Sequence, residues 1–315
     1  MKEQNNKIAY LQLFLAMAIV GSTIVVSKLI ADSFPTFFGT SLTLIVALIG
    51  ITPFYLYQNK KNKVIPKTSD WKYLVLQSLT GVVLFRVLSF YGLKMTSPVD
   101  AGIITSTTPA IIALIAMFML KERISRNMWV GIVFAILGVS IINLFTEVHN
   151  SIEGVNNKIF GNFIIIFAVI CEALFTIFRK KTPNIPAIHG SFHIIWIGLL
   201  LSIPFAFIDI DYSALKNYSF NDFLPILYYG IFGSVIAFIL WFDGVSKVSA
   251  SIAGLFTGIM PVSAVILSFL FLNENIYWYH IVGIILVLLG IFYGSKKAKN
   301  KSYKEEKPVA NNVYN

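Results

Sequence analysis

Long apolar runs, separated by short polar segments, recur along the whole chain. Each run is about 17 to 23 residues long, the length that an α-helix needs to cross a hydrocarbon core of roughly 30 Å. We therefore predict an all-α, polytopic membrane protein with ten transmembrane helices. The predicted spans are residues 8–30, 36–57, 74–93, 100–120, 128–145, 160–178, 191–208, 224–242, 249–272 and 279–295.

The chain contains one pattern twice. Residues 91–139 and 243–291 align without a gap, and six identical pairs share an offset of 152. The pairs are Gly92/Gly244, Gly102/Gly254, Pro109/Pro261, Glu122/Glu274, Gly131/Gly283 and Gly138/Gly290. Chance is a poor explanation for such a set, so we infer a duplicated unit. Its parts are a first five-helix repeat (1–145), an external linker (146–158), a second five-helix repeat (159–295) and a disordered cytoplasmic tail (296–315).

The distribution of basic residues predicts the orientation of the spans. With the N-terminus in the cytoplasm, 20 of the 25 lysines and arginines fall in cytoplasmic segments, where membrane proteins retain positive charge. We therefore predict that both termini are cytoplasmic. Because five is an odd number of spans, the second repeat would enter the membrane in the opposite direction. Inverted repeats of this kind place a transport site at their interface, near the membrane midplane.

Composition excludes other classes of protein. A mean hydropathy of +0.76 with 13% charged residues excludes an ordinary soluble domain. The net charge of +10 lies mostly in short loops and the tail, so we expect no nucleic-acid partner. The first apolar run, at about 23 residues, exceeds the 7–15 residues of a signal-peptide core, and we interpret it as a retained helix. The single cysteine, Cys171, excludes an internal disulfide.

The stretch 92–139 combines small residues, a proline, a Glu-containing loop and a Gly-bearing helix, and the second copy repeats this order. In the first span, Gly21 is followed by Lys28. In these features the sequence resembles the EamA-like, ten-helix branch of the drug/metabolite transporter superfamily, over about residues 8–294. The resemblance implies a secondary transporter, usually an exporter of small metabolites, amino-acid-like compounds or drugs.

Two ionisable residues lie deep in predicted spans. Arg86 is about 12 residues into the third span and Glu172 about 12 into the sixth, which gives similar depths at about 1.5 Å per residue. Each alone would cost about 2.5–3.5 kcal/mol to insert, so a partner or a wet cavity is expected. We hypothesise that Arg86 holds an anionic group of the substrate and that Glu172 is its counter-ion or a proton-coupling acid. The alternative is snorkelling, with Glu172 directed toward Arg179.

Thr107 and Thr257 each stand in a short polar stretch before a proline, Pro109 or Pro261. A proline removes a backbone donor, which a membrane tolerates only against protein or water. We therefore predict symmetric kinks that act as hinges, with Thr107 and Thr257 as substrate contacts. The alternative is that these small residues serve helix packing.

The resemblance adds four weaker candidates for substrate contacts: Thr23, Ser89, Phe238 and Trp241. For the two aromatic residues, the alternative is packing or contact with lipid. We expect Glu122 and Glu274 to cap helix ends or loops rather than to bind substrate.

We predict a secondary active transporter that exports a small molecule across the bacterial plasma membrane by alternating access. Proton coupling and a homodimer are compatible with the sequence. Metabolite uptake, or exchange of a nucleotide-sugar or head group, is the alternative. The sequence has no HExxH or GxSxG motif and no His/Cys/Asp cluster at ligand spacing, so we expect neither an enzyme nor a metal or other cofactor.

Overall fold

The computed structural model describes residues 2–96, 101, 104–148, 158–210, 218–272 and 276–296, and over these residues it contains helices and no strand. The helices are α1 (Lys2–Ser33), α2 (Thr36–Lys61), α3 (Thr68–Gln77), η1 (Ser78–Leu84), α4 (Phe85–Met95), α6 (Thr108–Met119), α7 (Arg126–Val148), α8 (Lys158–Lys180), α9 (Ala187–Asp209), α10 (Phe220–Tyr228), η3 (Tyr229–Ile236), α11 (Ala237–Lys247), α12 (Ala250–Phe256), α13 (Ile259–Leu272) and α14 (Trp278–Ser295). Glu274, Gly102, most of the 146–158 linker and the tail from residue 297 lie outside the described residues.

Within the described residues, seven helical segments are long and apolar enough to cross a membrane. They are Thr36–Lys61, Thr68–Ser89, Ile159–Lys180, Ala187–Asp209, Phe220–Lys247, Ala250–Leu267 and Trp278–Ser295, and shorter apolar segments lie at Thr108–Met119 and Arg126–Ile142. Together with α1, these segments fall where the apolar runs predicted helices. The structure is therefore that of a multi-pass helical membrane protein.

Several helices begin at local signals in the sequence. Pro35 and Pro186 directly precede α2 and α9, where a fixed φ and a missing N–H suit a helix start. Ser249 caps α12, because its hydroxyl accepts a hydrogen bond from the Ile252 N–H at 3.2 Å. These residues determine where the chain turns back into the bundle.

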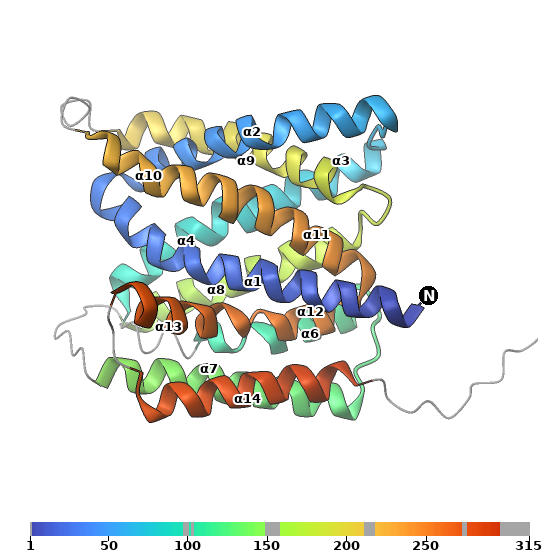
Figure 1. Cartoon of the computed structure of the whole chain (residues 1–315), viewed down its shortest axis with the longest axis vertical. Helices are drawn as coiled ribbons and strands as arrows, with labels where there is room; N and C mark the ends of the chain where they lie inside the picture. Colours follow the sequence, from blue (N-terminus) through green and yellow to red (C-terminus); the bar gives the residue numbers. More distant parts are fainter. Residues whose placement is uncertain are drawn as a thin grey trace, which may run out of the picture.

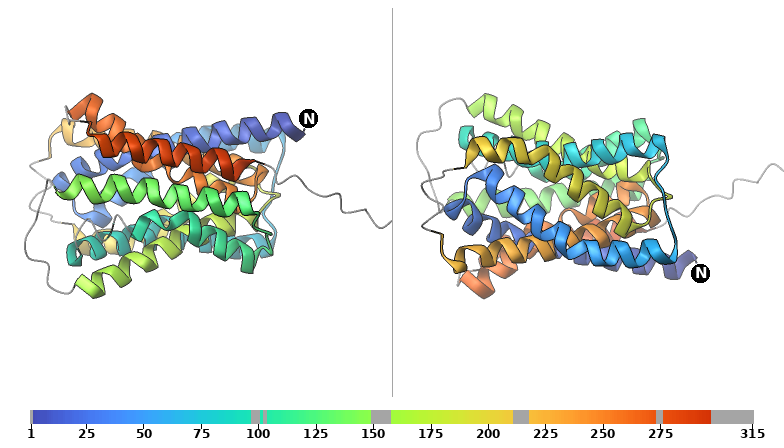
Figure 2. Two further views of the ribbon diagram at one scale, coloured as in Figure 1. Left: turned by 90° about the horizontal axis from the view of Figure 1, so that it is seen from below. Right: turned by 90° about the horizontal axis from the view of Figure 1, so that it is seen from above.

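The helices form one bundle in which they run roughly along a common direction (Figures 1 and 2). α2 packs against α9 at one edge of the bundle, and α7 packs against α14 at the opposite edge (Figure 1). Between these pairs, α1 contacts α11 and α13, while α8 contacts α4 and α6. Helices of the first half of the chain therefore pack mainly against helices of the second half.

Glycines allow α7 and α14 to approach each other closely. A Cβ added at Gly131 would lie 2.6 Å from the Gly290 oxygen, and one added at Gly138 would lie 2.6 Å from the Gly283 oxygen. Conversely, a Cβ at Gly283 or Gly290 would meet the Gly138 or Gly131 oxygen at 2.7 Å. A larger residue at any of these positions would separate the helices. Small residues at a membrane helix interface permit this kind of contact.

Two predicted spans are interrupted near their midpoints. One interruption is at Thr107, before α6, and the other is at residues 257–258, between α12 and α13. Pro109 and Pro261 lie in the first turns of α6 and α13. The sequence predicted a kink within one continuous helix at each proline. The structure instead shows a break, because each helix ends before the proline and a new helix begins there. The first turn accepts proline because its N–H groups have no intrahelical partner.

π-helical turns interrupt two further long helices. η1 begins at Ser78 and η3 at Tyr229, which are 151 residues apart (229 − 78), close to the repeat offset. Neither was predicted. π-helical turns are uncommon and often mark functional positions.

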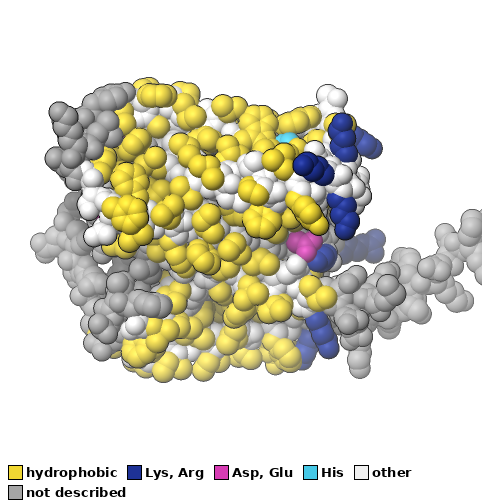
Figure 3. All heavy atoms as spheres, turned by 45° about the horizontal axis from the view of Figure 1, so that its top comes forward, with side chains coloured by type: hydrophobic (Ala, Val, Ile, Leu, Met, Phe, Trp, Pro, Cys, Tyr) yellow, Lys and Arg dark blue, Asp and Glu magenta, His cyan; other side chains and the backbone are white. Residues whose placement is uncertain are grey.

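The surface is apolar along its flank and basic at one end. Figure 3 shows hydrophobic side chains over the visible flank, with Lys and Arg gathered at one end of the molecule. Phe118, Ile159 and Phe207 are among the large exposed side chains, at 75%, 76% and 68% exposure. An apolar flank of this extent suits contact with lipid tails.

Candidate functional site

A cavity of about 150 Å³ lies where the two interrupted spans meet, and we call it the central cavity. The described residues that line it are Phe85, Thr105, Ser106, Thr108, Pro109, Val139, Glu172, Thr257, Gly258, Met260 and Pro261. The structure therefore brings together four of the predicted site residues: Glu172, Thr257 and both prolines. Thr107 adjoins this group at the first interruption.

Threonine hydroxyls satisfy backbone carbonyls at both interruptions. The Thr107 hydroxyl donates to the Ile104 oxygen at 2.6 Å, and the Thr107 N–H donates to the same oxygen at 3.0 Å. The Thr257 hydroxyl and N–H likewise donate to the Gly254 oxygen, at 2.7 and 3.2 Å. The carbonyls released by each break thus have partners within the protein, as a membrane requires. α6 and α13 begin at the cavity, so their N-terminal ends provide partial positive charge there.

Glu172, on α8, is the one carboxylate among the described residues that line the central cavity, and none of them is basic. Its Oε2 lies 3.3 Å from the Thr108 hydroxyl, which also contacts the Thr105 oxygen at 2.7 Å. Thr108 is the first residue of α6, and a helix N-terminus favours a nearby negative charge. An acid in this setting can bind a cationic group or take up a proton. The suggested approach to Arg179 is wrong, because that guanidinium is 2% exposed and donates to the Phe242, Thr182 and Ile185 oxygens.

Arg86 does not line the central cavity. Its Nη2 donates to the Tyr229 hydroxyl at 3.1 Å, and its guanidinium lies 4.9 Å from the centre of the same ring. Arg86 also borders a gap of about 10 Å³ near Thr40 and Ser202. In the described part of the chain, Arg86 and Glu172 are therefore not paired with each other. Instead, Arg86 follows η1 and contacts the first residue of η3.

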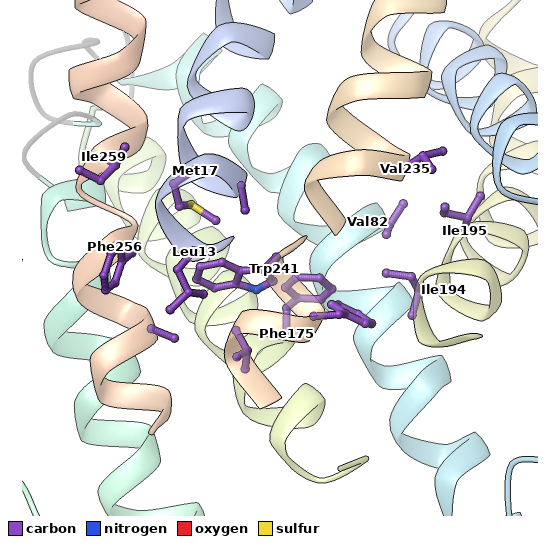
Figure 4. Close-up of a cluster of buried hydrophobic side chains, with 14 of the residues drawn as sticks. Leu13, Met17, Val82, Phe175, Ile194, Ile195, Val235, Trp241, Phe256 and Ile259 are labelled. Atoms are coloured by element: carbon purple, nitrogen blue, oxygen red, sulfur yellow. The ribbon is translucent and has the colours of Figure 1, made fainter. Parts of the chain in front are cut away.

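The weaker candidates lie away from the central cavity. Trp241 is 4% exposed and packs in the hydrophobic core beside Leu13 and Phe175 (Figure 4). Phe238 packs against the same Phe175, with ring centres 6.0 Å apart. These contacts agree with the packing alternative for both aromatic residues.

The two polar members of that weaker group also lie outside the cavity lining. Thr23 is buried, donates to the Val20 oxygen at 2.7 Å and faces Gly233. Ser89 is a half-buried residue of α4. Sequence position alone did not distinguish these residues from the ones that reach the cavity.

A second and larger cavity, of about 510 Å³, lies at the basic end of the bundle, and we call it the basic cavity. Arg123, Lys180, Lys247 and Lys296 contribute cationic side chains to it. Ser251 and Ile252 of α12 also line it, whereas Thr257 and Gly258, at the other end of α12, line the central cavity. α12 therefore separates the two cavities.

Two charged residues hold the chain where it enters α12. Glu122 accepts hydrogen bonds from the Ala250 N–H (2.7 Å), the Ser251 N–H (3.1 Å) and the Ser251 hydroxyl (2.7 Å). The Lys180 ammonium donates to the Val248 oxygen at 2.7 Å and also contacts the Val245 oxygen at 3.2 Å. Glu122 caps a helix, as predicted, but that helix belongs to the other half of the chain. Apart from the pairing of Glu122 with Glu274, no sequence pattern indicated this partner.

A multi-pass helical protein whose interrupted spans enclose a cavity with a carboxylate and several hydroxyl groups has the architecture of a membrane transporter. The chain belongs to the EamA-like transporter family, which matches it at residues 7–144 and again at 159–295. This finding confirms the resemblance to the drug/metabolite transporter superfamily. The protein is accordingly a transporter of small molecules in a lipid bilayer, and not an enzyme.

Individual relatives support the same assignment. The uncharacterized transporter YetK of Bacillus subtilis is 40% identical over 292 residues, which cover 92% of this chain and 88% of YetK. The uncharacterized transporter YyaM of the same organism is 28% identical over 76% of this chain and 77% of its own. A solved structure, described only as the crystal structure of a protein, has a TM-score of 0.77 at 16% identity and covers 91% of this chain and 96% of its own. That likeness concerns the fold alone.

Proposed function

We propose that the protein is a secondary active transporter that exports a small metabolite, amino-acid-like compound or drug across the bacterial plasma membrane by alternating access. The observation that carries this proposal is the central cavity, where two interrupted spans meet at Glu172. Helix interruptions are tolerated in a membrane where they line a cavity, and transporters use them to present backbone groups and charge to a solute. The described lining of the cavity comes from one chain, so the proposal requires no partner subunit, and a homodimer is compatible with it.

The proposed architecture is ten spans in two inverted five-helix repeats. Its support is that the family matches each half separately and that helix interruptions and π-helical turns occur in both halves. The contacts Gly131–Gly290 and Gly138–Gly283 exchange with each other under the offset of 152. A two-fold axis between α7 and α14 would generate this reciprocity.

The proposed orientation places both termini and the basic end of the bundle in the cytoplasm. Its support is the charge asymmetry, since 20 of the 25 lysines and arginines fall in segments predicted to be cytoplasmic. The basic cavity then faces the cytoplasm, and the central cavity is reached from it past α12.

Within this scheme Glu172 is the coupling residue: it takes up a proton or the cationic group of a substrate, and its charge changes along the transport cycle. Arg86 has a partner in Tyr229, so the scheme gives it a role in joining the two halves. Arg86 could bind an anionic substrate group only after the Tyr229 contact opens.

The test is metabolite profiling of spent medium from cells that express wild type, Glu172→Gln or no transporter. Glutamine keeps the size of the side chain but cannot exchange a proton, so we expect the exported compound to be enriched with wild type only. Asp243→Asn is the matched control, because this carboxylate lies at the basic end and pairs with Lys247 at 2.6 Å. Equal membrane amounts of all variants must be verified by blotting. Enrichment with Glu172→Gln at the wild-type level and with an unchanged pH dependence would disprove the coupling role.

The alternative of uptake or exchange is decided with the compound that profiling identifies. Sealed vesicles of known orientation are loaded with it, and its efflux is followed with and without a pH gradient. Export predicts net movement of the compound away from the cytoplasmic face, in the direction opposite to proton entry. Exchange instead requires a counter-substrate on the other side.

A further inference from the structure

The basic cavity is formed where several helices end. It lies among the N-terminal parts of α1 and α7 and the ends of α8, α11 and α14, and α12 forms part of its wall. Its volume of about 510 Å³ is within the range of about 300–1,000 Å³ that is typical of small-molecule sites. Tyr10, Ser125 and Ser295 add hydroxyl groups to the lining. The cavity is thus large and polar enough for a ligand of its own.

The lining carries an excess of positive charge. Its four cations face one lining carboxylate, Glu122, which already accepts three hydrogen bonds from Ala250 and Ser251. Asp243 lies close by and pairs with Lys247. Arg123, Lys180 and Lys296 therefore share the one lining carboxylate, and the three cations together keep a net positive charge.

The remaining cations can bind a ligand. The Lys180 ammonium donates to the Val245 and Val248 carbonyl oxygens, which are neutral, and the nearby Glu122 offsets only part of the positive charge of the three cations. Arg123 is exposed, and Lys296 rests on the Phe292 ring at 4.1 Å. A guanidinium and two ammonium groups around one cavity match the geometry and charge of a phosphate group.

We propose that the basic cavity binds an organic phosphate. The phosphate group sits among Arg123, Lys180 and Lys296, and the hydroxyl groups of the lining receive the rest of the ligand. Two sources share this chemistry: a soluble phosphorylated metabolite and the head group of an anionic lipid. The inference does not depend on the direction or coupling of transport, so binding to the isolated protein tests it separately from the proposed function.

The test uses the full-length protein in detergent with two probes. Glycerol 3-phosphate, measured by isothermal titration, represents the soluble source, and phosphatidylglycerol, measured as retained lipid by native mass spectrometry, represents the membrane source. The test variant is Arg123→Gln with Lys296→Gln. The matched control is Arg126→Gln with Lys61→Gln, which removes one arginine from the same loop region and one lysine from another helix end, neither of which lines the cavity.

We expect one probe to bind wild type and the control pair equally, and to bind the test pair at least about tenfold more weakly, since each basic residue near an anionic head group contributes roughly fivefold. The probe that behaves in this way identifies the source. If the test pair misfolds, Arg123→Lys with Lys296→Arg keeps both charges and must retain binding. Absence of binding by both probes, or equal weakening by the test and control pairs, would overturn the proposal.

Discussion

The central and basic cavities are separated by one short helix and differ in size and charge. The central cavity, at about 150 Å³, has one carboxylate and no basic residue among its described lining, whereas the basic cavity, at about 510 Å³, has four cationic residues. The cost of charge explains the difference, because a charged group at the centre of a membrane costs about 2.5–3.5 kcal/mol and a group at its surface costs little. A single acid in the central cavity is therefore consistent with the role proposed for Glu172, whereas a cluster of cations at the end of the bundle costs little free energy.

The comparison also identifies α12 as the element that keeps the two environments apart. Thr257, in the central cavity, is six positions after Ser251, in the basic cavity (257 − 251), which corresponds to a rise of about 9 Å. Phe256, the last residue of this short helix, packs against Tyr10 of α1, with ring centres 5.6 Å apart. Any path between the cavities must displace this wall.

The largest expected effect concerns access to the two cavities. In a Cys171→Ser background, which removes the native thiol, we expect Ser295→Cys to react with a charged methanethiosulfonate reagent about a hundredfold faster than Thr257→Cys. Ser295 lines the open basic cavity, whereas Thr257 is 5% exposed. The rates are measured by mass shift under native conditions. Equal rates would mean that α12 does not separate the cavities.

Removing the cap on α12 should weaken that separation. We expect Glu122→Ala to lower the free energy of unfolding by about 2–4 kcal/mol, because charge-assisted hydrogen bonds to α12 are lost. The reactivity of Thr257→Cys should rise in the same variant. Glu122→Gln keeps one acceptor oxygen and should have a smaller effect in both assays, which are thermal unfolding in detergent and thiol labelling. Wild-type stability in Glu122→Ala would contradict the role of the cap.

The prolines should matter for transport more than for stability. Alanine at Pro109 or Pro261 allows the two short helices at each break to join, so we expect transport to fall by about an order of magnitude, while the unfolding midpoint changes little. Pro204→Ala, within α9 and outside the central-cavity lining, is the control. Unchanged transport in both proline variants would show that the breaks do not depend on these residues.

The smallest expected effect is at the contact between η1 and η3. Tyr229→Phe keeps the ring beneath Arg86 but removes the hydroxyl acceptor, so we expect a loss of about 1 kcal/mol of stability, measured by denaturation in mixed micelles. Tyr228→Phe, which removes the neighbouring contact with Ser22 at 2.8 Å, is the matched control. A loss of stability no greater than in the control would mean that the Arg86–Tyr229 hydrogen bond makes no measurable contribution to the free energy of unfolding.

Much of the fold could be predicted because membrane helices follow directly from apolar length. The repeated glycines indicated only a duplication, and the structure adds that Gly131, Gly138, Gly283 and Gly290 meet one another in one contact between α7 and α14. Glycine was informative there because only a residue without a side chain permits that separation. The two prolines predicted kinks, and each of them instead lies just after a break between two helices.

The candidate site was predicted only in part, because depth along a helix does not determine the direction in which a side chain points. Arg86 and Glu172 have similar predicted depths, but Arg86 turns toward Tyr229 and Glu172 toward Thr108. The π-helical turn before Arg86 adds a rotation that no regular periodicity would reveal. Likewise, the partner of Glu122 lies 128 residues away, in the other half of the chain.

The short helices around the breaks have a consequence for biogenesis. α12 has 7 residues and α6 has 12, so they rise only about 10 and 18 Å, well short of a hydrocarbon core of about 30 Å. Neither piece could be recognised by the insertion machinery as a spanning segment, so each span must enter the bilayer as one apolar stretch. The polar groups of the first break gain Glu172 as a neighbour only when α8 has been made. The cavity is therefore a product of late assembly, and a nascent chain that ends after its first half would carry an unfinished site.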